Sequence, residues 1–331
     1  MILKADGPSI AQAAQALRDG QLVGLPTETV YGLAANATDD AAVARIFAAK
    51  GRPADHPLIV HVASAAQVPM FAAQVPDFAQ ALIDAFWPGP LTLILPRKPG
   101  VATASAGGQD SIGLRCPSHP VAQQLLQACA ALGVYGLSAP SANRFGRVSP
   151  TTAAHVQSEL GKDLLILDGG ECPVGIESTI IDCTRGEPVL LRPGHITRVQ
   201  IEAACGRAVL DKDAIAQAAP RASGTLESHY APRAKVRLMR ASDIDAKLQA
   251  LGPHANNLGV WSAVRPDDGA GFLGAGVVWR LQSASAEQAA HDLFSVLREL
   301  DARGVQQIWV QLPPDAPEWE GVRDRLQRAA A

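Results

Sequence analysis

The sequence predicts an α/β protein with two domains, a larger one built on a twisted mixed β-sheet with flanking helices and a smaller α/β domain after it. Three observations predict this. A chain of 331 residues is too long for one hydrophobic core, which favours two domains. Up to about Pro193, short apolar strands alternate with alanine-rich helices. Several of these strands follow one another without a helix between them, which is typical of a mixed sheet.

The N-terminal domain is assigned to residues 1–205 and is expected to hold most of the elements. Its first 20 residues have the pattern of a strand, a turn and an amphipathic helix. Further strands are expected at 22–25, 58–62, 91–95, 112–115, 133–138, 164–168, 178–182 and 189–192. Helices are expected at 9–19, 39–50, 79–86, 120–132, 151–160 and 196–205.

Residues 206–233 have weak periodicity and are interpreted as a long linker. Its segment "SHYAPR" carries an aromatic ring and a histidine, which indicates that it packs on the protein, with the mouth of the active site as one location. Residues 234–331 form the smaller domain, with strands in "KVRLM", "NNLGVWSAV" and "QQIWVQLP" and helices at 241–251, 286–303 and 319–330.

Standard nucleotide-binding loops are missing from the sequence. Residues 269–274 match G-x-G-x-x-G, but an apolar segment, "VVWRL", follows where a dinucleotide fingerprint needs a helix, so a plain glycine-rich loop is favoured. No G-x-x-x-x-G-K-[ST] sequence occurs. A nucleotide would therefore have to be bound without either loop.

Composition excludes several classes of protein. The net charge of −3 gives no basic footprint for stable nucleic-acid binding, although transient contact stays open. Five cysteines without a C-x-x-C pair argue against a disulfide framework and against a zinc site. The N-terminus lacks a signal-peptide pattern, and no apolar run approaches the roughly 20 residues of a membrane helix, so a cytoplasmic location without membrane contact is expected.

One polar stretch interrupts two apolar runs near the N-terminus. Pro26-Thr27-Glu28-Thr29 separates "GQLVGL" from "VYGL". The stretch is either a cap or tight turn, or a set of side chains that face a ligand. Glu177-Ser178-Thr179 repeats the same kind of sequence at the start of a later strand.

Cations gather at the ends of apolar segments although the chain is acidic overall. They are Lys50, Arg52, Arg115, Arg144, Arg147 and Arg192. Such local focusing favours an anionic ligand in a cavity. For single residues other interpretations stay open: Lys50 suits a helix C-terminus, Arg115 suits a salt bridge at the rim, and His61 suits a structural role.

The densest polar segment is "LSAPSANRFGRVSPTT", which ends at Thr152. It combines hydroxyls, an amide and two arginines just before a predicted helix. A helix N-terminus favours anions, so the segment is either a phosphate cradle or a surface turn with an N-cap.

Together these segments resemble the L-threonylcarbamoyladenylate synthase family (YrdC-like domain) in its long form with a C-terminal extension. The resemblance rests on "PTETVYGL", "KGRP", "HPLIVHV", "WPGPLTLIL", "IGLRCP", "SAPSAN", "GIESTIID", "LLRPG" and "HYAP", in the family's order. It implies a YrdC-like catalytic domain and a smaller, Rossmann-like α/β C-terminal domain.

The resemblance also implies an activity. The enzyme would condense L-threonine, bicarbonate and ATP into threonylcarbamoyl-AMP and pyrophosphate, for the threonylcarbamoyladenosine modification of tRNA. The amine of threonine would form a carbamate, whose oxygen would attack the α-phosphorus of ATP, with Mg²⁺ and the cations above neutralising charge. Transient contact with the transferase that uses the product is expected.

Site residues are carried over from the matching motifs. The resemblance places Thr29, His61, Arg115, Ala139 and Ser178 around L-threonine, with Arg115 as the partner of its carboxylate. It places Arg52, His56, Ser111, Ser141, Asn143, Ser149, Arg192 and Tyr230 against ATP. Lys50 and Arg52 would be catalytic, and no metal ligands are assigned. Thr27 and Glu28 stay undecided between shaping their loop and touching ligand or metal.

Two other functions were weighed against the synthase. One is an amidase-type hydrolase that uses Lys50 with the hydroxyls of Ser138, Ser141 and Ser178, since lysine-activated serines are established chemistry. The other is a non-catalytic RNA-binding module, which the net negative charge disfavours.

Overall fold

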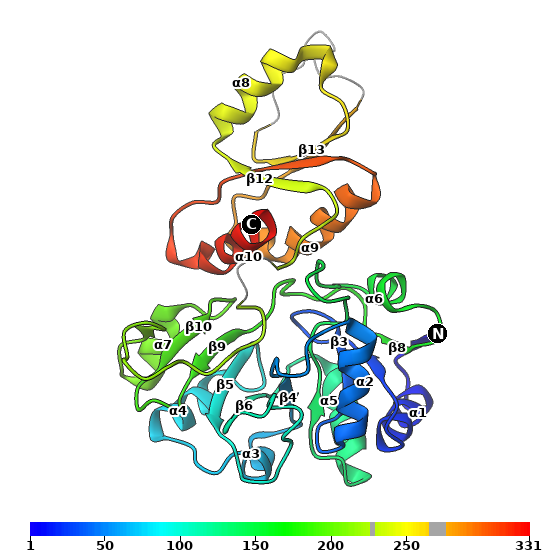
Figure 1. The fold of residues 1–331 in the computed structure, drawn as a ribbon, viewed down its shortest axis with the longest axis vertical. Helices are drawn as coiled ribbons and strands as arrows, with labels where there is room; N and C mark the ends of the chain where they lie inside the picture. Colours follow the sequence, from blue (N-terminus) through cyan, green and yellow to red (C-terminus); the bar gives the residue numbers. More distant parts are fainter. Residues whose placement is uncertain (226–228, 265–275) are drawn as a thin grey trace. The chain divides into compact units, whose positions relative to one another are not determined.

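The chain folds into two compact units. The computed structural model describes residues 1–225, 229–264 and 276–331. Unit 1 consists of Met1–Phe145 and Ser149–Thr225, and unit 2 of Gly146–Val148 and Leu226–Ala331. Each unit has its own sheet (Figure 1). Among the helices in the described part of the chain, none combines the length and apolar character needed to cross a bilayer.

The sheet of unit 1 is large and mixed. In the described residues it has eleven strands in the order β1-β8-β2-β3-β7-β4-β6-β5-β9-β10-β11. Their bounds are β1 Ile2–Lys4, β2 Val23–Leu25, β3 Gly32–Asn36, β4 Ile59–His61, β5 Leu91–Pro96, β6 Ser111–Arg115, β7 Leu137–Ser138, β8 Leu165–Asp168, β9 Thr179–Asp182, β10 Val189–Arg192 and β11 Leu210–Asp211. Parallel pairs such as β4 with β6 stand beside antiparallel pairs such as β5 with β6, which confirms the predicted mixed sheet.

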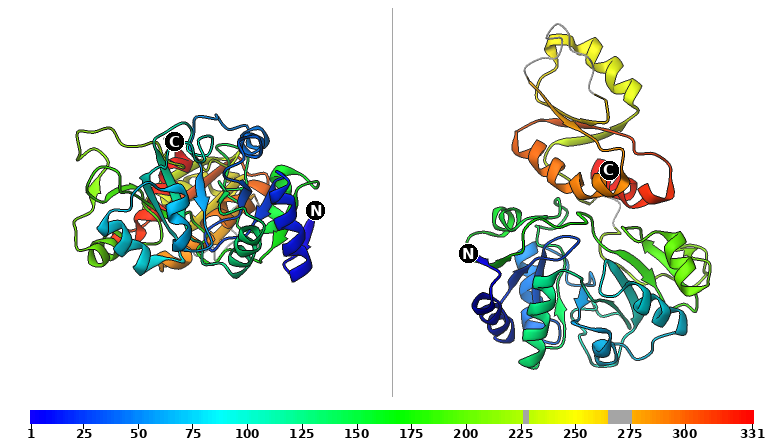
Figure 2. Two further views of the ribbon diagram at one scale, coloured as in Figure 1. Left: turned by 90° about the horizontal axis from the view of Figure 1, so that it is seen from below. Right: turned by 180° about the vertical axis from the view of Figure 1, so that it is seen from behind.

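Helices cover this sheet in two groups. Their bounds are α1 Gly7–Arg18, α2 Asp40–Lys50, α3 Val68–Phe71, α4 Asp77–Phe86, α5 Pro120–Ala131, α6 Ala153–Leu160 and α7 Arg198–Cys205. Figures 1 and 2 show α1, α2 and α5 beside β3 and β8, and α4 and α7 beside β5, β9 and β10. Local sequence sets the ends of α2, because the Asp39 side chain accepts from the N–H groups of Ala41 and Ala42, and Gly51 ends the helix in the left-handed conformation.

The central strands β4, β6, β5 and β9 have two different faces. Side chains alternate along a strand, so Ile112 and Leu114 of β6 lie on one face and Ser111, Gly113 and Arg115 on the other. The first face belongs to a hydrophobic core with Val60 of β4, Leu93 of β5 and residues of α4 and α7. The opposite face carries both polar side chains and the apolar side chains of Ile59 and Ile94.

Residues 206–225, expected to be linker, pack with unit 1. β11 pairs in parallel with β10, and Ile215, Ala219 and Ala222 pack against Ile94 and its neighbours. Arg185 holds this segment by donating to the carbonyl oxygens of Lys212 (3.2 Å) and Gln217 (3.0 Å). The two-residue strand β11 is too short to show strand periodicity, so its pairing with β10 was not visible in the sequence.

Unit 2 contains a smaller parallel sheet, which confirms the predicted C-terminal α/β domain. Its described strands run β12-β15-β13-β14, with bounds β12 Lys235–Met239, β13 Leu258–Ser262, β14 Val277–Leu281 and β15 Gln307–Gln311. The helices are α8 Ala241–Leu251, α9 Ala286–Ala302 and α10 Glu320–Ala330. Figures 1 and 2 show α8 on one face of this sheet and α9 and α10 on the other.

Some elements differ from the sequence predictions. The strand expected at 133–138 is only β7, because Gly133 has a positive φ of 84° and residues 134–136 run as irregular chain. β3 and α3 were not among the expected elements, since β3 is short and alanine-rich and α3 is a single turn. The glycine-rich segment at 269–274 lies outside the described residues.

A fully buried ion pair of unit 1 gives a stability prediction. Asp182 Oδ2 lies 2.6 Å from Arg185 Nε, and both side chains are fully buried. Asp182→Asn leaves the guanidinium buried without its carboxylate, so we expect the free energy of unfolding to fall by about 3 kcal/mol in urea titrations.

The matched control is Glu187→Gln, which breaks the exposed pair of Glu187 with Arg207. Because exposed pairs contribute little, we expect a change below about 0.5 kcal/mol. Equal losses in the two variants would contradict a special role for the buried pair.

Candidate functional site

The face of the central strands opposite α4 and α7 brings several predicted residues together. In the parallel ladder of β4 and β6, His61 pairs with Arg115 and Ile59 with Gly113. Ser111 lies on the same face of β6, four residues before Arg115. On β5, Thr92 lies on this face too, because Ile94 pairs with Gly113. The strand register therefore places these polar side chains on one face, beside the apolar side chains of Ile59 and Ile94.

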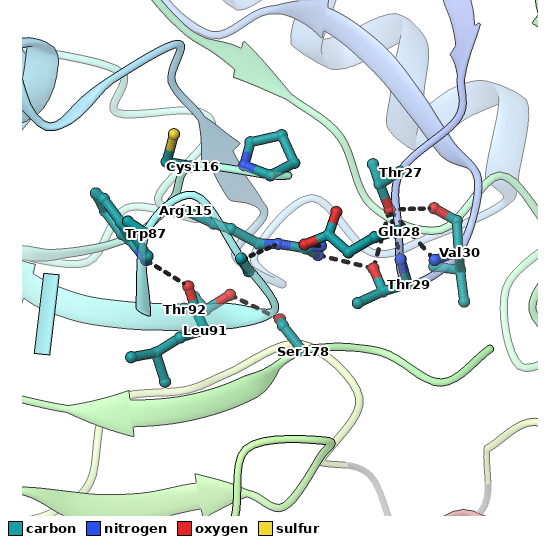
Figure 3. A network of polar contacts seen from close by, with 12 residues as sticks. Thr27, Glu28, Thr29, Val30, Trp87, Leu91, Thr92, Arg115, Cys116 and Ser178 are labelled. Carbon is teal, nitrogen blue, oxygen red and sulfur yellow. Dashed lines mark hydrogen bonds and ion pairs between the residues drawn. The ribbon is translucent and has the colours of Figure 1, made fainter. Parts of the chain in front are cut away.

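The stretch Pro26-Thr27-Glu28-Thr29 is the loop of a hairpin between β2 and β3, in which Leu25 pairs with Gly32. Thr27 shapes the loop: its Oγ1 donates to the carbonyl of Val30 (2.6 Å) and accepts from the N–H groups of Thr29 and Val30 (both 3.2 Å). With Thr27 holding the turn, Glu28 and Thr29 project toward Arg115 (Figure 3). The loop is both a tight turn and a platform for polar groups.

Arg115 is the centre of the polar cluster. Its Nη1 donates to Thr29 Oγ1 at 2.8 Å, its Nη2 lies 2.7 Å from Glu28 Oε1, and its Nε donates to the Gly89 carbonyl at 3.3 Å. All three side chains, Arg115, Glu28 and Thr29, are buried. Arg115 is therefore held in one orientation by two consecutive residues of the hairpin loop.

Ser178 joins Thr92 of β5 to a second arginine, Arg192. Ser178 Oγ lies 2.7 Å from Thr92 Oγ1. Arg192 donates to the carbonyl of Ser178 through Nε (3.1 Å) and Nη2 (2.9 Å), and Nη2 also lies 3.2 Å from Ser178 Oγ. Residues assigned to threonine (Ser178) and to ATP (Arg192) are thus in direct contact.

His61 of β4 lies beside Arg115 of β6, and Ala139 directly follows β7, the other neighbour of β4. His61 Nδ1 is 3.3 Å from the carbonyl of Ile59, and the N–H of Ala139 donates to that same carbonyl. Burial, helped by the Arg115 charge, lowers the pKa of His61 to about 3. At neutral pH the imidazole is therefore uncharged and contributes a polar edge rather than a cation.

The side chain of Lys50 binds the backbone of the "SAN" segment, residues 141–143. Its Nζ donates to the carbonyl oxygens of Ser141 and Asn143, and the side chain is buried. Burial, followed by the nearby Arg52 charge, lowers the pKa of Lys50 well below its usual range. An anion bound beside Lys50 would oppose both effects and favour the ammonium form.

Arg52 and Arg192 meet at Ser223. Arg52 Nη2 lies 3.2 Å from Ser223 Oγ, and Arg192 Nη1 donates to the Ser223 carbonyl at 3.0 Å. His56 lies on the same loop and packs edge-on against Phe145, with ring centroids 5.5 Å apart. Burial, followed by the Arg52 charge, lowers the pKa of His56.

An open cavity adjoins Ser223. It has about 290 Å³ of empty volume and lies between residues 221–223 and the face of the central strands that carries Arg115. Ser111 lines it from β6, and Thr92 lines it from β5. Of the residues assigned to ATP, only Ser111 lines the cavity itself, while Arg52 and Arg192 reach its wall through Ser223.

Two further residues assigned to ATP, Ser149 and Tyr230, contact other parts of the chain. Ser149 Oγ donates to Glu177 Oε1 at 2.5 Å, so Ser149 is joined to the residue before Ser178. Tyr230 belongs to unit 2, where its buried ring packs on Phe294 (centroids 5.2 Å apart) and under the Arg325 guanidinium (5.6 Å). Tyr230 is therefore not part of the cluster in unit 1.

Four residues of this cluster were not predicted from the sequence. They are Thr92, Glu177 and Ser223, which had no role, and Glu28, which was undecided. The one sequence signal for Glu177 was that Glu177-Ser178-Thr179 resembles Glu28-Thr29. The roles of Thr92 and Ser223 follow only from the positions of the strands and of residues 206–225 in the folded protein.

The arrangement does not suit the hydrolase. Lys50 Nζ donates to two backbone carbonyls and to no serine hydroxyl. Ser138 Oγ donates to Ser105 Oγ at 2.7 Å, and Ser178 Oγ contacts Thr92. In the described residues the lysine and the serines are therefore not paired as nucleophile and base.

Metal ligands are also not gathered in the part of the chain that the structure describes. There, no three side chains of His, Cys, Asp or Glu form a group that would hold a metal ion. The cluster is instead dominated by arginine, lysine and hydroxyl groups, which bind anions.

The low pKa of His61 predicts a pH dependence of stability. Because the folded-state pKa of about 3 lies below the ordinary 6.5, the unfolded chain takes up the proton first as the pH falls. His61 should lower the free energy of unfolding by up to about 1.4 kcal/mol for each pH unit below 6.5.

Urea titrations between pH 6.5 and 5 measure this slope in the wild type and in His61→Gln. We expect the variant to lack this part of the slope, whatever its stability at pH 7. Identical slopes in the two proteins would contradict a buried neutral imidazole.

Comparison with protein families gives two matches that together span the chain. A family model described as "Telomere recombination" (Sua5, YciO and YrdC) matches residues 15–194. A second, described as "Threonylcarbamoyl-AMP synthase, C-terminal domain", matches residues 196–331. The boundary between them falls just after β10.

Individual relatives match over nearly the whole length. The threonylcarbamoyl-AMP synthase of Pyrococcus abyssi is 40% identical, with 96% of this chain and 93% of the relative covered. That of Bacillus subtilis is 39% identical, with 99% and 94% covered. A crystal structure of P. abyssi Sua5 with L-threonine superposes with a TM-score of 0.87 at 36% identity and covers 100% of this chain and 97% of its own. The resemblance drawn from the motifs is confirmed: the chain belongs to the threonylcarbamoyl-AMP synthase family.

Proposed function

We propose that the protein is an L-threonylcarbamoyladenylate synthase, a nucleotidyltransferase that forms threonylcarbamoyl-AMP and pyrophosphate from L-threonine, bicarbonate and ATP. The observation that carries the proposal is that the two buried arginines have separate polar partners in unit 1: Arg115 is held by Glu28 and Thr29, and Arg192 by Ser178. Membership of the family and the threonine complex of P. abyssi Sua5 support it.

The threonine half of the site is proposed around Arg115. Its guanidinium is fixed by Glu28 and Thr29, and the fork geometry suits a substrate carboxylate. The neutral His61 and the small Ala139 would border the side chain of threonine, with Ser178 on the opposite side. Water excluded from this buried face would strengthen each of these contacts.

The ATP half is proposed along Arg52, Ser111 and Arg192, next to the cavity. Arg52 and Arg192 converge on Ser223 from two elements, so phosphate groups entering there would meet two cations. His56, Ser141, Asn143, Ser149 and Tyr230 remain predicted ATP contacts. Lys50 fixes the backbone of Ser141 and Asn143 and would neutralise charge beside them.

The chemistry follows from these placements. The α-ammonium group of threonine loses a proton, and the resulting amine combines with bicarbonate to give a carbamate and water. A carbamate oxygen then attacks the α-phosphorus of ATP, the bond from that phosphorus to the bridging oxygen breaks, and pyrophosphate leaves. Positioning and charge neutralisation by Lys50 and Arg52 are sufficient for transfer at phosphorus, and no covalent nucleophile is required.

Magnesium would enter as the complex with ATP. Phosphate oxygens and water normally supply most ligands of nucleotide-bound Mg²⁺, which fits a site without a cluster of carboxylates in the described residues. The ion would neutralise charge on the triphosphate as pyrophosphate departs.

The product defines the partner. A mixed anhydride of a carbamate and AMP is labile, so a transferase that passes the threonylcarbamoyl group to tRNA must receive it soon after release. We propose transient contact with that transferase in the cytoplasm, without stable binding of nucleic acid.

The reaction predicts a strict requirement for three substrates. With Mg²⁺ present, pyrophosphate release measured by a coupled assay should need L-threonine, bicarbonate and ATP together, because the carbamate must form before phosphorus is attacked. Release at the full rate without threonine, or no release with all three, would contradict the proposed function.

Arg115 provides a test of the threonine half. Arg115→Lys keeps the charge but loses the fork, so we expect the KM for threonine to rise about tenfold or more while the KM for ATP changes less than about threefold. Arg207→Lys, at an exposed pair, is the control and should leave both constants unchanged. An unaltered KM for threonine in Arg115→Lys would remove Arg115 from the threonine site.

A further inference from the structure

Glu28 is a buried acid that the proposed reaction has not used. The residue is only 4% exposed, and its Oε1 lies 2.7 Å from Arg115 Nη2. Its Oε2 is buried and has no hydrogen-bond partner among the described residues. Figure 3 shows the carboxylate between the guanidinium and the hairpin loop.

Nothing in the loop itself satisfies that oxygen. The N–H groups of Thr29 and Val30 donate to Thr27 Oγ1, and the Thr29 hydroxyl contacts both Thr27 and Arg115. A buried carboxylate oxygen without a donor is unfavourable, because nothing replaces the hydrogen bonds that it makes to water in the unfolded chain. A donor that arrives with the ligand would remove this cost.

Charge identifies the donor. L-Threonine carries a carboxylate and, on the neighbouring atom, an ammonium group. Arg115 attracts the carboxylate, but a buried ammonium needs its own counter-charge. The other acid of the cluster, Glu177, already accepts from Ser149, whereas Glu28 adjoins the Arg115 fork.

We propose that Glu28 binds the α-ammonium group of L-threonine through Oε2 while Arg115 holds the carboxylate. The inference rests on the proposed function and adds a residue that selects α-amino acids. In this arrangement the ion pair of Glu28 with Arg115 is kept, and the ligand adds a second pair beside it. The nitrogen that receives the carboxyl group is thereby fixed in place.

The test compares two ligands on two variants. Calorimetric titration without ATP measures binding of L-threonine and of 3-hydroxybutanoate, which lacks the α-amine. Glu28→Gln keeps an oxygen for Arg115 but turns an amide NH₂ toward the ammonium. We expect threonine binding to weaken at least about tenfold, while binding of 3-hydroxybutanoate changes less than about threefold.

Two further variants complete the experiment. Glu28→Asp retains the charge on a shorter side chain and should recover part of the preference for threonine. Glu187→Gln, at an exposed glutamate, should leave both affinities unchanged. Thermal unfolding of each variant is measured as well, to check that every variant is folded in the binding experiments.

The outcomes separate this inference from the proposed function. Equal weakening of both ligands in Glu28→Gln would mean that Glu28 acts only by orienting Arg115, and unchanged threonine binding would mean that it does not touch the amine. Either result overturns the inference and leaves the synthase proposal intact. Failure of the wild type to bind threonine at all would overturn both.

Discussion

Alternation of side chains along β6 is the constraint on which the site depends. Ile112 and Leu114 must enter the core against α4 and α7, and this places Ser111 and Arg115 on the opposite face. A shift of register by one residue would bury the arginine in the core and expose the leucine, so the hydrophobic packing fixes the register. The site is thus held by the same burial that stabilises the fold.

The second requirement is electrostatic. Arg115 is buried, and an unpaired guanidinium in that position would be strongly unfavourable. Glu28 and Thr29 satisfy it from a hairpin loop whose conformation is set by one threonine hydroxyl. Charge compensation and preorganisation therefore come from the same five-residue stretch, Pro26 to Val30, and a ligand finds the guanidinium already oriented.

Residues 206–225 connect stability with the site in unit 1. The buried pair of Asp182 and Arg185 anchors this segment through the carbonyls of Lys212 and Gln217, and the same segment brings Ser223 to Arg52 and Arg192. The wall of the cavity thus depends on contacts made at the far end of β9.

Much of the fold was determined by local sequence. Caps such as Asp39 and Gly51 mark α2, apolar runs mark β4, β5 and β6, and cations at strand ends predicted a site for an anion. Which of these groups meet was decided only by tertiary structure. Lys50 reaches the carbonyls of Ser141 and Asn143, and Arg115 reaches Glu28, because strands far apart in the chain are hydrogen-bonded neighbours. Strand order and register arise from the packing of the whole domain, so the sequence by itself determined the chemical groups, and the folded sheet decided which of them act together.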